Sequence, residues 1–340
     1  MDSPSKYDAK NRSQAKGRLG ERQRRVRIVR WTIDPEVKRE AEAHYRTAFA
    51  LRLRDRAPEE IMQELTFDGL GSAGVVEVEK LLDFIERKLL RRSISGIGLE
   101  VGSGPGTFGA ILARRSSVRS VYAVELCEPI VAELMPKVAS RVLNGSEEKL
   151  IGVNGDFDRL ELPEGTIDFV FDFFALHHSV DLESTLRECG RVLKSGGFIL
   201  CLDKARPDHY QRSDLEELLD QQYDDAFKQH FGLPLDRQLT RRTNGEKEYR
   251  LKDWKNAFRA GGFASAQHFN LAKLGAASAL TRLLKEVLCS IPVWAQKSLN
   301  RYLPTPRVGH KFVLDSRNRI FTRLIDPFPK EISLLIASKE

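Results

Sequence analysis

The sequence lacks the long apolar runs and the paired cysteines that mark several large classes of protein. None of its 340 residues fall in an apolar run of about 18, so we expect no transmembrane helix. The basic start has no apolar segment behind it, which argues against a secretory signal. The four cysteines are far apart and form no C-x-x-C pair, so neither a zinc site nor a disulfide framework is indicated. This composition favours a protein of the reducing cytoplasm, without a bound metal.

Aromatic residues are few, at 8%, but hydrophobic residues reach 41%, which is enough for a substantial core. The charges are segregated along the chain. Residues 1–30 hold ten Lys and Arg against three Asp and Glu, residues 31–270 hold 33 against 40, and residues 271–340 hold 12 against 5. We therefore predict a basic flexible tail over 1–30 and a folded middle that is acidic.

Short apolar runs alternate with amphipathic segments from about residue 93 onward, which is typical of βαβ units. Strands are predicted over 96–101, 120–125, 149–154, 168–173, 197–203, 264–270 and 332–338. Helices between the first five are predicted over 107–115, 129–142 and 182–193. The pattern predicts an α/β fold with a doubly wound, seven-stranded, mostly parallel sheet.

The remaining segments predict additions to this sheet. Helices are expected over 34–53, 58–65 and 75–90, forming a helical lid over 31–92 before a core over 93–272. The 273–330 connection, between the sixth and seventh strands, is far longer than a hairpin needs, so it predicts an inserted cap ahead of the last core strand, 331–340. Amphipathic segments in this cap fit ordinary core packing, a lid, a membrane-surface contact or a homodimer interface. An Asn244-Gly245 pair predicts a tight turn.

A glycine-rich loop follows the first strand of the predicted sheet. Gly102, Gly104 and Gly106 stand at alternate positions, where they let the backbone turn sharply and approach a ligand closely. The run from Gly104 to Gly109 also satisfies the G-x-G-x-x-G pattern of dinucleotide-binding proteins. Against a dinucleotide, Pro105 removes an amide hydrogen from a loop that would bind pyrophosphate. The loop alone leaves the kind of cofactor open.

Acidic residues end the next two strands. Glu125 closes the second strand, 23 positions after Gly102, where its carboxylate can accept hydrogen bonds from a ribose diol. Asp156 and Phe157 follow the third strand, and an acid beside an aromatic ring suits an adenine. These residues favour an adenosyl cofactor.

With the A-L-H-H run that ends at His178 and the later L-R-E and R-V-L-K-x-G-G runs, these motifs resemble the class I S-adenosylmethionine-dependent methyltransferases. The resemblance is to the type-11 branch, which includes ubiquinone- and menaquinone-biosynthesis enzymes, and it covers residues 78–272. It implies a Rossmann-like core, S-adenosyl-L-methionine as cofactor and S-adenosyl-L-homocysteine as product. The cofactor-binding residues that it implies are Glu100, Gly102, Ser103, Gly104, Gly106, Glu125, Leu126, Asp156, Phe157 and Asp172. Asp172 departs from the branch, which usually carries Ser or Asn there.

Methyl transfer requires the acceptor atom and the methyl carbon to be held on axis, about 3–3.5 Å apart. An oxygen or nitrogen acceptor also loses a proton, so a base near neutral pH is useful. His177 and His178 follow the fourth strand, and Asp203 ends the fifth, on the side of the sheet where ligands bind. Because O-methyltransferases of the family use a His of such a pair with an Asp, we expect His178 to be the base, assisted by His177 and Asp203. His177 alternatively caps the following helix.

The residues between the fourth strand and this histidine pair leave two readings open. Phe173 and Phe174 are candidates for the acceptor pocket, although aromatic residues at a strand end often belong to the core. Asp172 would either steer a cationic acceptor amine or accept backbone hydrogen bonds.

The expected acceptor is a small metabolite or natural product. Aromatic residues are not interleaved with the basic residues of 10–30, which argues against nucleic acid as the partner. The run from Asp172 to Ala175 is also not the Pro-Pro-aromatic element of enzymes that methylate base amines. An RNA or protein methyltransferase guided by the tail is one alternative, and a cofactor-binding scaffold without catalysis is another.

Overall fold

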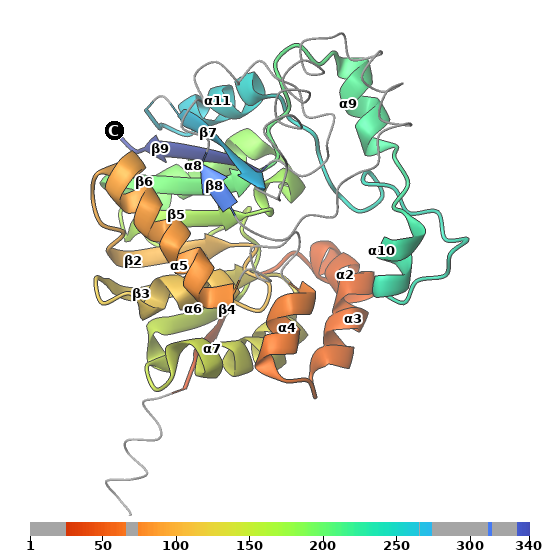
Figure 1. Ribbon diagram of the computed structural model, residues 1–340, viewed down its shortest axis with the longest axis horizontal. Helices are drawn as coiled ribbons and strands as arrows, with labels where there is room; N and C mark the ends of the chain where they lie inside the picture. Colours follow the sequence, from red (N-terminus) through yellow and green to blue (C-terminus); the bar gives the residue numbers. More distant parts are fainter. Residues whose placement is uncertain (1–24, 66–73, 265, 274–311, 315–331) are drawn as a thin grey trace, which may run out of the picture.

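The computed structural model describes residues 25–65, 74–264, 266–273, 312–314 and 332–340. Within them nine strands form one sheet in the order β1-β4-β3-β2-β5-β6-β9-β7-β8 (Figure 1). All seven predicted strands are present, as β2 (Gly96–Val101), β3 (Val118–Glu125), β4 (Leu150–Asn154), β5 (Ile167–Phe173), β6 (Leu193–Asp203), β7 (Gln267–Lys273) and β9 (Ile332–Ser338). The predicted fold class is confirmed.

The strand order fixes where a ligand can bind. β2 pairs in parallel with β3 on one side and with β5 on the other, and β4 and β6 extend the sheet in the same sense. β9 runs antiparallel between β6 and β7. The chain order therefore reverses between β2 and β5, and ligands of such sheets bind beyond the carboxyl ends of the strands at this point. The glycine loop follows β2 and the histidine pair follows β5.

Two strands were not predicted. β1 (Arg27–Arg30) pairs in parallel with β4, so the prediction of a flexible tail over 1–30 is wrong for these four residues. Its β-branched Ile28 and Val29 are half-buried and the flanking arginines are exposed, which suits an edge strand. β8 (Phe312–Leu314) pairs antiparallel with β7. Apart from β8, the predicted cap over 273–330 and the first 24 residues of the tail lie outside the described residues.

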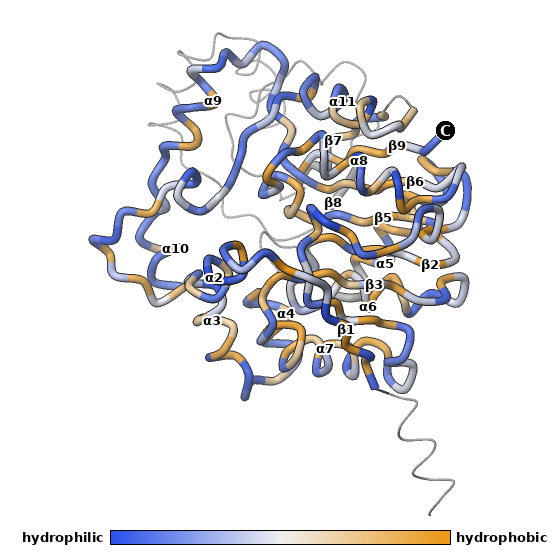
Figure 2. The backbone as a smooth tube through the Cα atoms, turned by 180° about the vertical axis from the view of Figure 1, so that it is seen from behind, coloured by the Kyte–Doolittle hydropathy of each residue, from blue (hydrophilic) through white to orange (hydrophobic). Residues whose placement is uncertain are grey.

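Helices cover both faces of the sheet. One core cluster joins α5 (Gly74–Phe84), α6 (Thr107–Arg114) and α7 (Met135–Leu143) to one face, and a second joins α8 (Leu182–Val192) and α11 (Leu251–Ala260) to the other. Short η3 (Ile130–Leu134) and η4 (Glu147–Lys149) flank α7. Hydrophobic residues concentrate along the strands, whereas the connection with α9 (Arg212–Leu219) and α10 (Asp225–His230) is mostly hydrophilic (Figure 2). No helix in the described ranges is long and apolar enough to cross a membrane.

The helix predicted over 34–53 is broken at His44 into α2 (Pro35–Ala43) and α3 (Tyr45–Leu53). His44 has an extended ψ of 139°, and its Nδ1 accepts the backbone N–H of Arg46, which caps the start of α3. The hydroxyl of Thr47 donates to the carbonyl of Ala41 at the end of α2. Side chains thus satisfy both helix ends at the break. α4 (Pro58–Leu65) has its predicted bounds, and α5 continues into the π-helix η2 (Ile85–Leu90).

The N-terminal helices pack against a part of the chain that is distant in sequence. The rings of Tyr45 and Phe49 in α3 contact the ring of Phe231, just after α10, at centroid distances of 5.1 and 4.8 Å. Arg52 donates to the carbonyl of Phe231 at 2.7 Å. Figure 1 shows α2, α3 and α10 side by side, beyond one end of the sheet. The β6–α11 connection, residues 204–250, lies within the predicted core over 93–272. In the structure it folds against the N-terminal helices.

Candidate functional site

The glycine loop after β2, residues 102–106, contacts another segment of the chain on one side and is open on the other. Gly102, Gly104 and Gly106 all have positive φ, of 58°, 52° and 73°. A Cβ built on Gly102 would lie 2.3 Å from the Cβ of Ala175, which follows β5. A Cβ built on Gly104 would meet no heavy atom within 4 Å. The loop thus touches the segment that leads to the histidine pair, and it leaves room over Gly104.

Glu125 faces this loop from the end of β3. Its Oε2 accepts the N–H of Gly104 and its Oε1 accepts the N–H of Cys127, both at 2.9 Å. A carboxylate oxygen can accept a second hydrogen bond, so the two backbone donors orient Glu125 without using up its acceptors. The neighbouring carbonyl of Leu126 accepts the side-chain amide of Asn154 at 2.9 Å, which ties the ends of β3 and β4 together.

The residues that the resemblance places around an adenosyl group lie beside the loop. Asp156 is partly exposed and accepts the N–H of Asp158 at 2.9 Å, and the ring of Phe157 lies 3.6 Å from a Cβ built on Gly102. At the start of α6, the buried hydroxyl of Thr107 has no hydrogen-bond partner among the described residues. The open space over Gly104, the oriented carboxylate of Glu125 and this hydroxyl fit a cofactor that carries a ribose diol and polar groups. Ser103 is buried and holds the loop, donating its N–H to Val124 at 2.8 Å.

Glu100 links β2 to α6, the two elements on either side of the glycine loop. It is 1% exposed and accepts the N–H of Gly109 at 2.8 Å. A Cβ on Gly109 would lie 2.5 Å from its Oε2, so this glycine lets α6 approach β2. Burial raises the pKa of the Glu100 carboxyl well above its ordinary value.

Asp172 is fully buried and holds the turn after β5. Its Oδ1 accepts the N–H groups of Ala175 and Leu176, at 3.1 and 3.0 Å, and its Oδ2 accepts the thiol of Cys201 at 3.1 Å. Of its two predicted roles, the structure shows the support of the backbone. Burial and the nearby Asp203 raise its pKa well above the ordinary value. Asp172, Cys201 and Asp203 bring ligand atoms within 4.8 Å of one another, but the thiol of Cys201 donates to Asp172 and the carboxylate of Asp203 accepts the N–H of His177, so these groups are engaged within the protein.

His177 and Asp203 form a buried pair between the ends of β5 and β6. The carboxylate accepts the ring Nδ1 at 2.7 Å and the backbone N–H of His177 at 3.0 Å, and it also accepts the N–H of Lys204 at 2.6 Å. Burial raises the pKa of Asp203 to about 6 and lowers the pKa of His177 well below its ordinary value. The ring of His177 is therefore fixed, and 3% exposure leaves it little access to solvent.

His178 lies beside this pair with its ring more accessible. Its ring centroid is 4.2 Å from that of His177, and a Cβ built on Gly245 would lie 3.8 Å from its Nδ1. Burial, His177 and Lys204 lower its pKa well below the ordinary value, which favours the neutral imidazole.

Phe173 and Phe174 are partly buried and lie between the glycine loop and the histidines. Phe173 packs on Phe108 at 4.5 Å between centroids, and Phe174 faces the ring of His177 at 6.1 Å. Phe174 has a φ of 54°, a left-handed conformation that an aromatic residue rarely adopts. Such strain is held by the surrounding structure and often occurs at functional sites.

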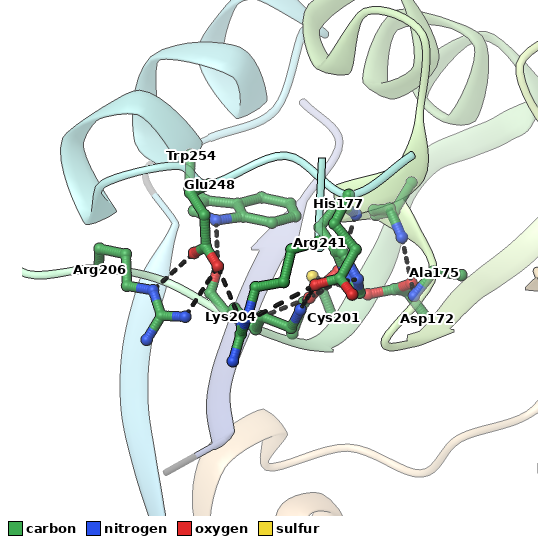
Figure 3. Close-up of polar contacts among 12 residues, drawn as sticks. Asp172, Ala175, His177, Cys201, Lys204, Arg206, Arg241, Glu248 and Trp254 are labelled. Atoms are coloured by element: carbon green, nitrogen blue, oxygen red, sulfur yellow. Dashed lines mark hydrogen bonds and ion pairs between the residues drawn. The ribbon is translucent and has the colours of Figure 1, made fainter. Parts of the chain in front are cut away.

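Sequence reasoning missed the charged residues of the β6–α11 connection that reach this site. Lys204 pairs with Glu246, and Arg206 binds Glu248 through two hydrogen bonds of 2.6 and 2.9 Å. Figure 3 shows Arg241 beside them, with its guanidinium 3.1 Å from Glu248. The sequence contains a pattern that could have predicted these pairs. The two cations stand at alternate positions directly after β6, and the two acids, Glu246 and Glu248, stand at alternate positions directly after the Asn-Gly turn. We had interpreted that pair only as a turn.

Comparison with known proteins agrees with this arrangement. Residues 99–201 match the family model described as a methyltransferase domain. A demethylmenaquinone methyltransferase of Roseiflexus castenholzii is 29% identical over 112 residues, which cover 33% of this chain and 44% of that protein. The ubiquinone/menaquinone biosynthesis C-methyltransferase UbiE of Caulobacter vibrioides is 36% identical over 70 residues, covering 21% of this chain and 28% of that protein.

Residues 99–201 belong to the class I, type-11 family of S-adenosylmethionine-dependent methyltransferases. The chain spans less than half the length of these two curated relatives. Among solved structures, the YcgJ protein of Bacillus subtilis superposes with a TM-score of 0.45 at 17% identity, covering 72% of this chain and 92% of that one. The methyltransferase domain contains the glycine loop, Glu125, both histidines and all of β5, whereas Asp203 and the β6–α11 connection follow it.

Proposed function

We propose that the chain transfers a methyl group from S-adenosylmethionine to an oxygen or nitrogen of a small-molecule acceptor, with His178 as the base. The cofactor would supply an electrophilic methyl group on a sulfonium. The residues that would hold it are the glycine loop, Glu125, Asp156 and Phe157, for the reasons of geometry given above. The part of this chain is to orient the two reactants, exclude water and take up one proton.

The place of His178 beside the proposed cofactor site is the observation that carries the proposal. His178 follows β5, three residues after the Ala175 that touches the glycine loop, so it lies on the side of the sheet where the cofactor fits. Burial and the neighbouring cation Lys204 disfavour its imidazolium, which favours the neutral ring. The buried His177–Asp203 pair packs behind it and holds the turn in place. His178 can thus accept the acceptor's proton at Nδ1 or Nε2.

The N-terminal helices and the β6–α11 connection are proposed to cover the acceptor. His44, at the break between α2 and α3, lies 3.1 Å from the side-chain carbonyl of Asn244, in the turn over the histidine pair. Near the cofactor end, the hydroxyl of Thr47 lies 3.0 Å from the sulfur of Cys127, two residues after Glu125. One helical segment therefore contacts both ends of the site, which suits a cover that excludes water during transfer.

Methyl-labelled S-adenosylmethionine tests the proposal. The full chain is incubated with the labelled cofactor and, separately, a metabolite extract, total RNA or total protein. We expect label in the small-molecule fraction, and mass spectrometry of the product then identifies the methylated atom. A product methylated on carbon would overturn the O or N assignment. This outcome is worth testing because a relative is named a C-methyltransferase. Label in RNA or protein would contradict a small acceptor, and binding without transfer in any fraction would indicate a scaffold.

A further inference from the structure

Glu246 joins three segments of the chain at one buried carboxylate. It is 6% exposed. Its Oε2 accepts the ammonium of Lys204, directly after β6, and its Oε1 accepts the hydroxyl of Tyr223. The side-chain amide of Asn244 donates to the same Oε1 at 3.3 Å and to the hydroxyl of Tyr223 at 3.1 Å. The proposed chemistry assigns no role to this junction.

The segment that carries Glu246, residues 240–248, is attached to the histidine pair. We call it the 240–248 arm. The backbone N–H of Lys247 donates to the carbonyl of His177 at 2.9 Å, and its ammonium donates to the carbonyl of Ser179. Gly245 lies over Nδ1 of His178, with a built Cβ 3.8 Å away. The arm therefore sets what surrounds both imidazoles.

Cations outnumber carboxylates around the histidine pair, and Glu246 is one of three carboxylates that offset them. Its Oε2 lies 4.0 Å from Nε2 of His177, which is too far for a hydrogen bond but close enough for a charge interaction. Lys204, whose charge acts on both histidines, is held by the same carboxylate. The other charged or titratable groups that face the pair are Asp203, Arg46, Lys247, Arg206, Arg241 and Glu248.

We propose that Glu246 is a positioning residue for methyl transfer, which fixes the 240–248 arm over the histidine pair and balances the charge of Lys204 beside His178. The inference rests on the proposed role of His178 as base. Without the carboxylate, Lys204 would lose its ion-pair partner, and only the charges of Asp203 and Glu248 would still offset it beside the imidazole. It would then disfavour the imidazolium that forms when His178 takes up a proton, and so weaken the base.

Glu248 provides a matched control two residues away. It is also buried, at 7% exposure, and its carboxylate also binds a cation that follows β6, Arg206. Among the described residues it makes no charged contact within 4.0 Å of either histidine, whereas Oε2 of Glu246 lies 4.0 Å from Nε2 of His177. The charge of Glu248 does act on His177, so the comparison is made at His178. A Glu248→Gln variant removes the same charge from the same arm, but it leaves Lys204 paired.

The experiment is a titration of His178 by NMR on the full chain with labelled histidine. Only seven histidines contribute signals, and His178→Gln assigns the one in question. We expect Lys204→Met to raise the pKa of His178 and Glu246→Gln to lower it, so that the two variants differ by about one unit or more. Glu248→Gln and the double variant Lys204→Met/Glu246→Gln should both stay close to the unmodified chain.

Equal His178 pKa values in Lys204→Met and Glu246→Gln would overturn the inference, as would a shift in Glu248→Gln as large as that in Glu246→Gln. If Glu246→Gln does not fold, Lys204→Met and the charge-balanced double variant still give the comparison. The titration needs neither acceptor nor turnover. A negative result in the titration therefore leaves the proposed function standing. An unchanged methyl-transfer rate in His178→Ala would instead show that His178 is not the base, and the effect of the charges on the pKa of His178 could still be measured in the other variants.

Discussion

The proposed cofactor end of this sheet, at the glycine loop and Glu125, and the proposed acceptor end, at the histidine pair, are built by different kinds of contact. At the cofactor end, the backbone of Gly102–Gly106 does most of the shaping, and Glu125 is oriented by two N–H groups within 21 residues of it. At the acceptor end, side chains as distant in sequence as His44 and Asn244 meet over the histidine pair. Local turn geometry therefore shapes the cofactor end, whereas polar residues distant in sequence shape the acceptor end.

Replacing His178 by Ala should separate the two ends most strongly. If His178 is the base, kcat should fall by roughly 10²–10⁴-fold, because proton removal then depends on water. Binding of S-adenosylmethionine should be unchanged, since the residues proposed to hold the cofactor do not include His178. Steady-state kinetics and calorimetry check the two parts. His209→Ala, at an exposed histidine outside the site, is the control, and an unaltered kcat in His178→Ala would remove this residue from the mechanism.

Two glycine substitutions should divide folding from binding at the cofactor end. Gly102→Ala should destabilise the chain by about 2 kcal/mol or more, because the new methyl would meet Ala175 and the φ of 58° is unfavourable. Gly104→Ala has a similar φ but a free environment, so it should cost only about 1 kcal/mol while its methyl fills the space proposed for the cofactor. Urea unfolding measures the first effect and calorimetry the second. Equal stability of the two variants would contradict this account of the loop.

The contact between His44 and Asn244 should give a smaller effect, confined to the acceptor end. His44→Ala removes the 3.1 Å contact and the cap on α3, so we expect the acceptor KM to rise about 5-fold, equivalent to about 1 kcal/mol. The Kd for S-adenosylmethionine should stay the same. His44→Asn keeps a capping side chain but is too short to reach Asn244, so it should show the same KM change without the loss of helix stability. A change in cofactor affinity without a change in the acceptor KM would contradict the placement of His44 at the acceptor end.

The strand, loop and helix of the cofactor end can be predicted from the sequence for a physical reason. A strand, a glycine loop and a helix lie within about 20 residues, and positive φ at Gly102, Gly104 and Gly106 is a need that only glycine meets easily. The seven strands of the core were predictable in the same way, from short apolar runs. β1 was missed because Arg27 and Arg30 hide a four-residue edge strand in a basic segment. The break at His44 was missed because its cap depends on one side chain.

The acceptor end could be predicted only in part. His177, His178 and Asp203 were placed together because the ends of adjacent parallel strands meet at one edge, but the sequence did not show which histidine pairs with Asp203. The partners of Lys204 lie about 40 residues away, and no local pattern states that Glu246 and not Glu248 will reach it. Such pairings depend on how the 204–250 connection folds against α3, which is a tertiary property.

Calorimetric titration of S-adenosylmethionine into the full chain and into Glu125→Gln tests the central claim most directly. The account predicts that the unmodified chain binds the cofactor and that the variant binds it roughly 10–100-fold more weakly. The reason is that Gln keeps the shape of Glu125 but loses charge-assisted hydrogen bonds worth about 1.5–3 kcal/mol. No binding by the unmodified chain at millimolar cofactor, or equal affinity of the two proteins, would contradict it.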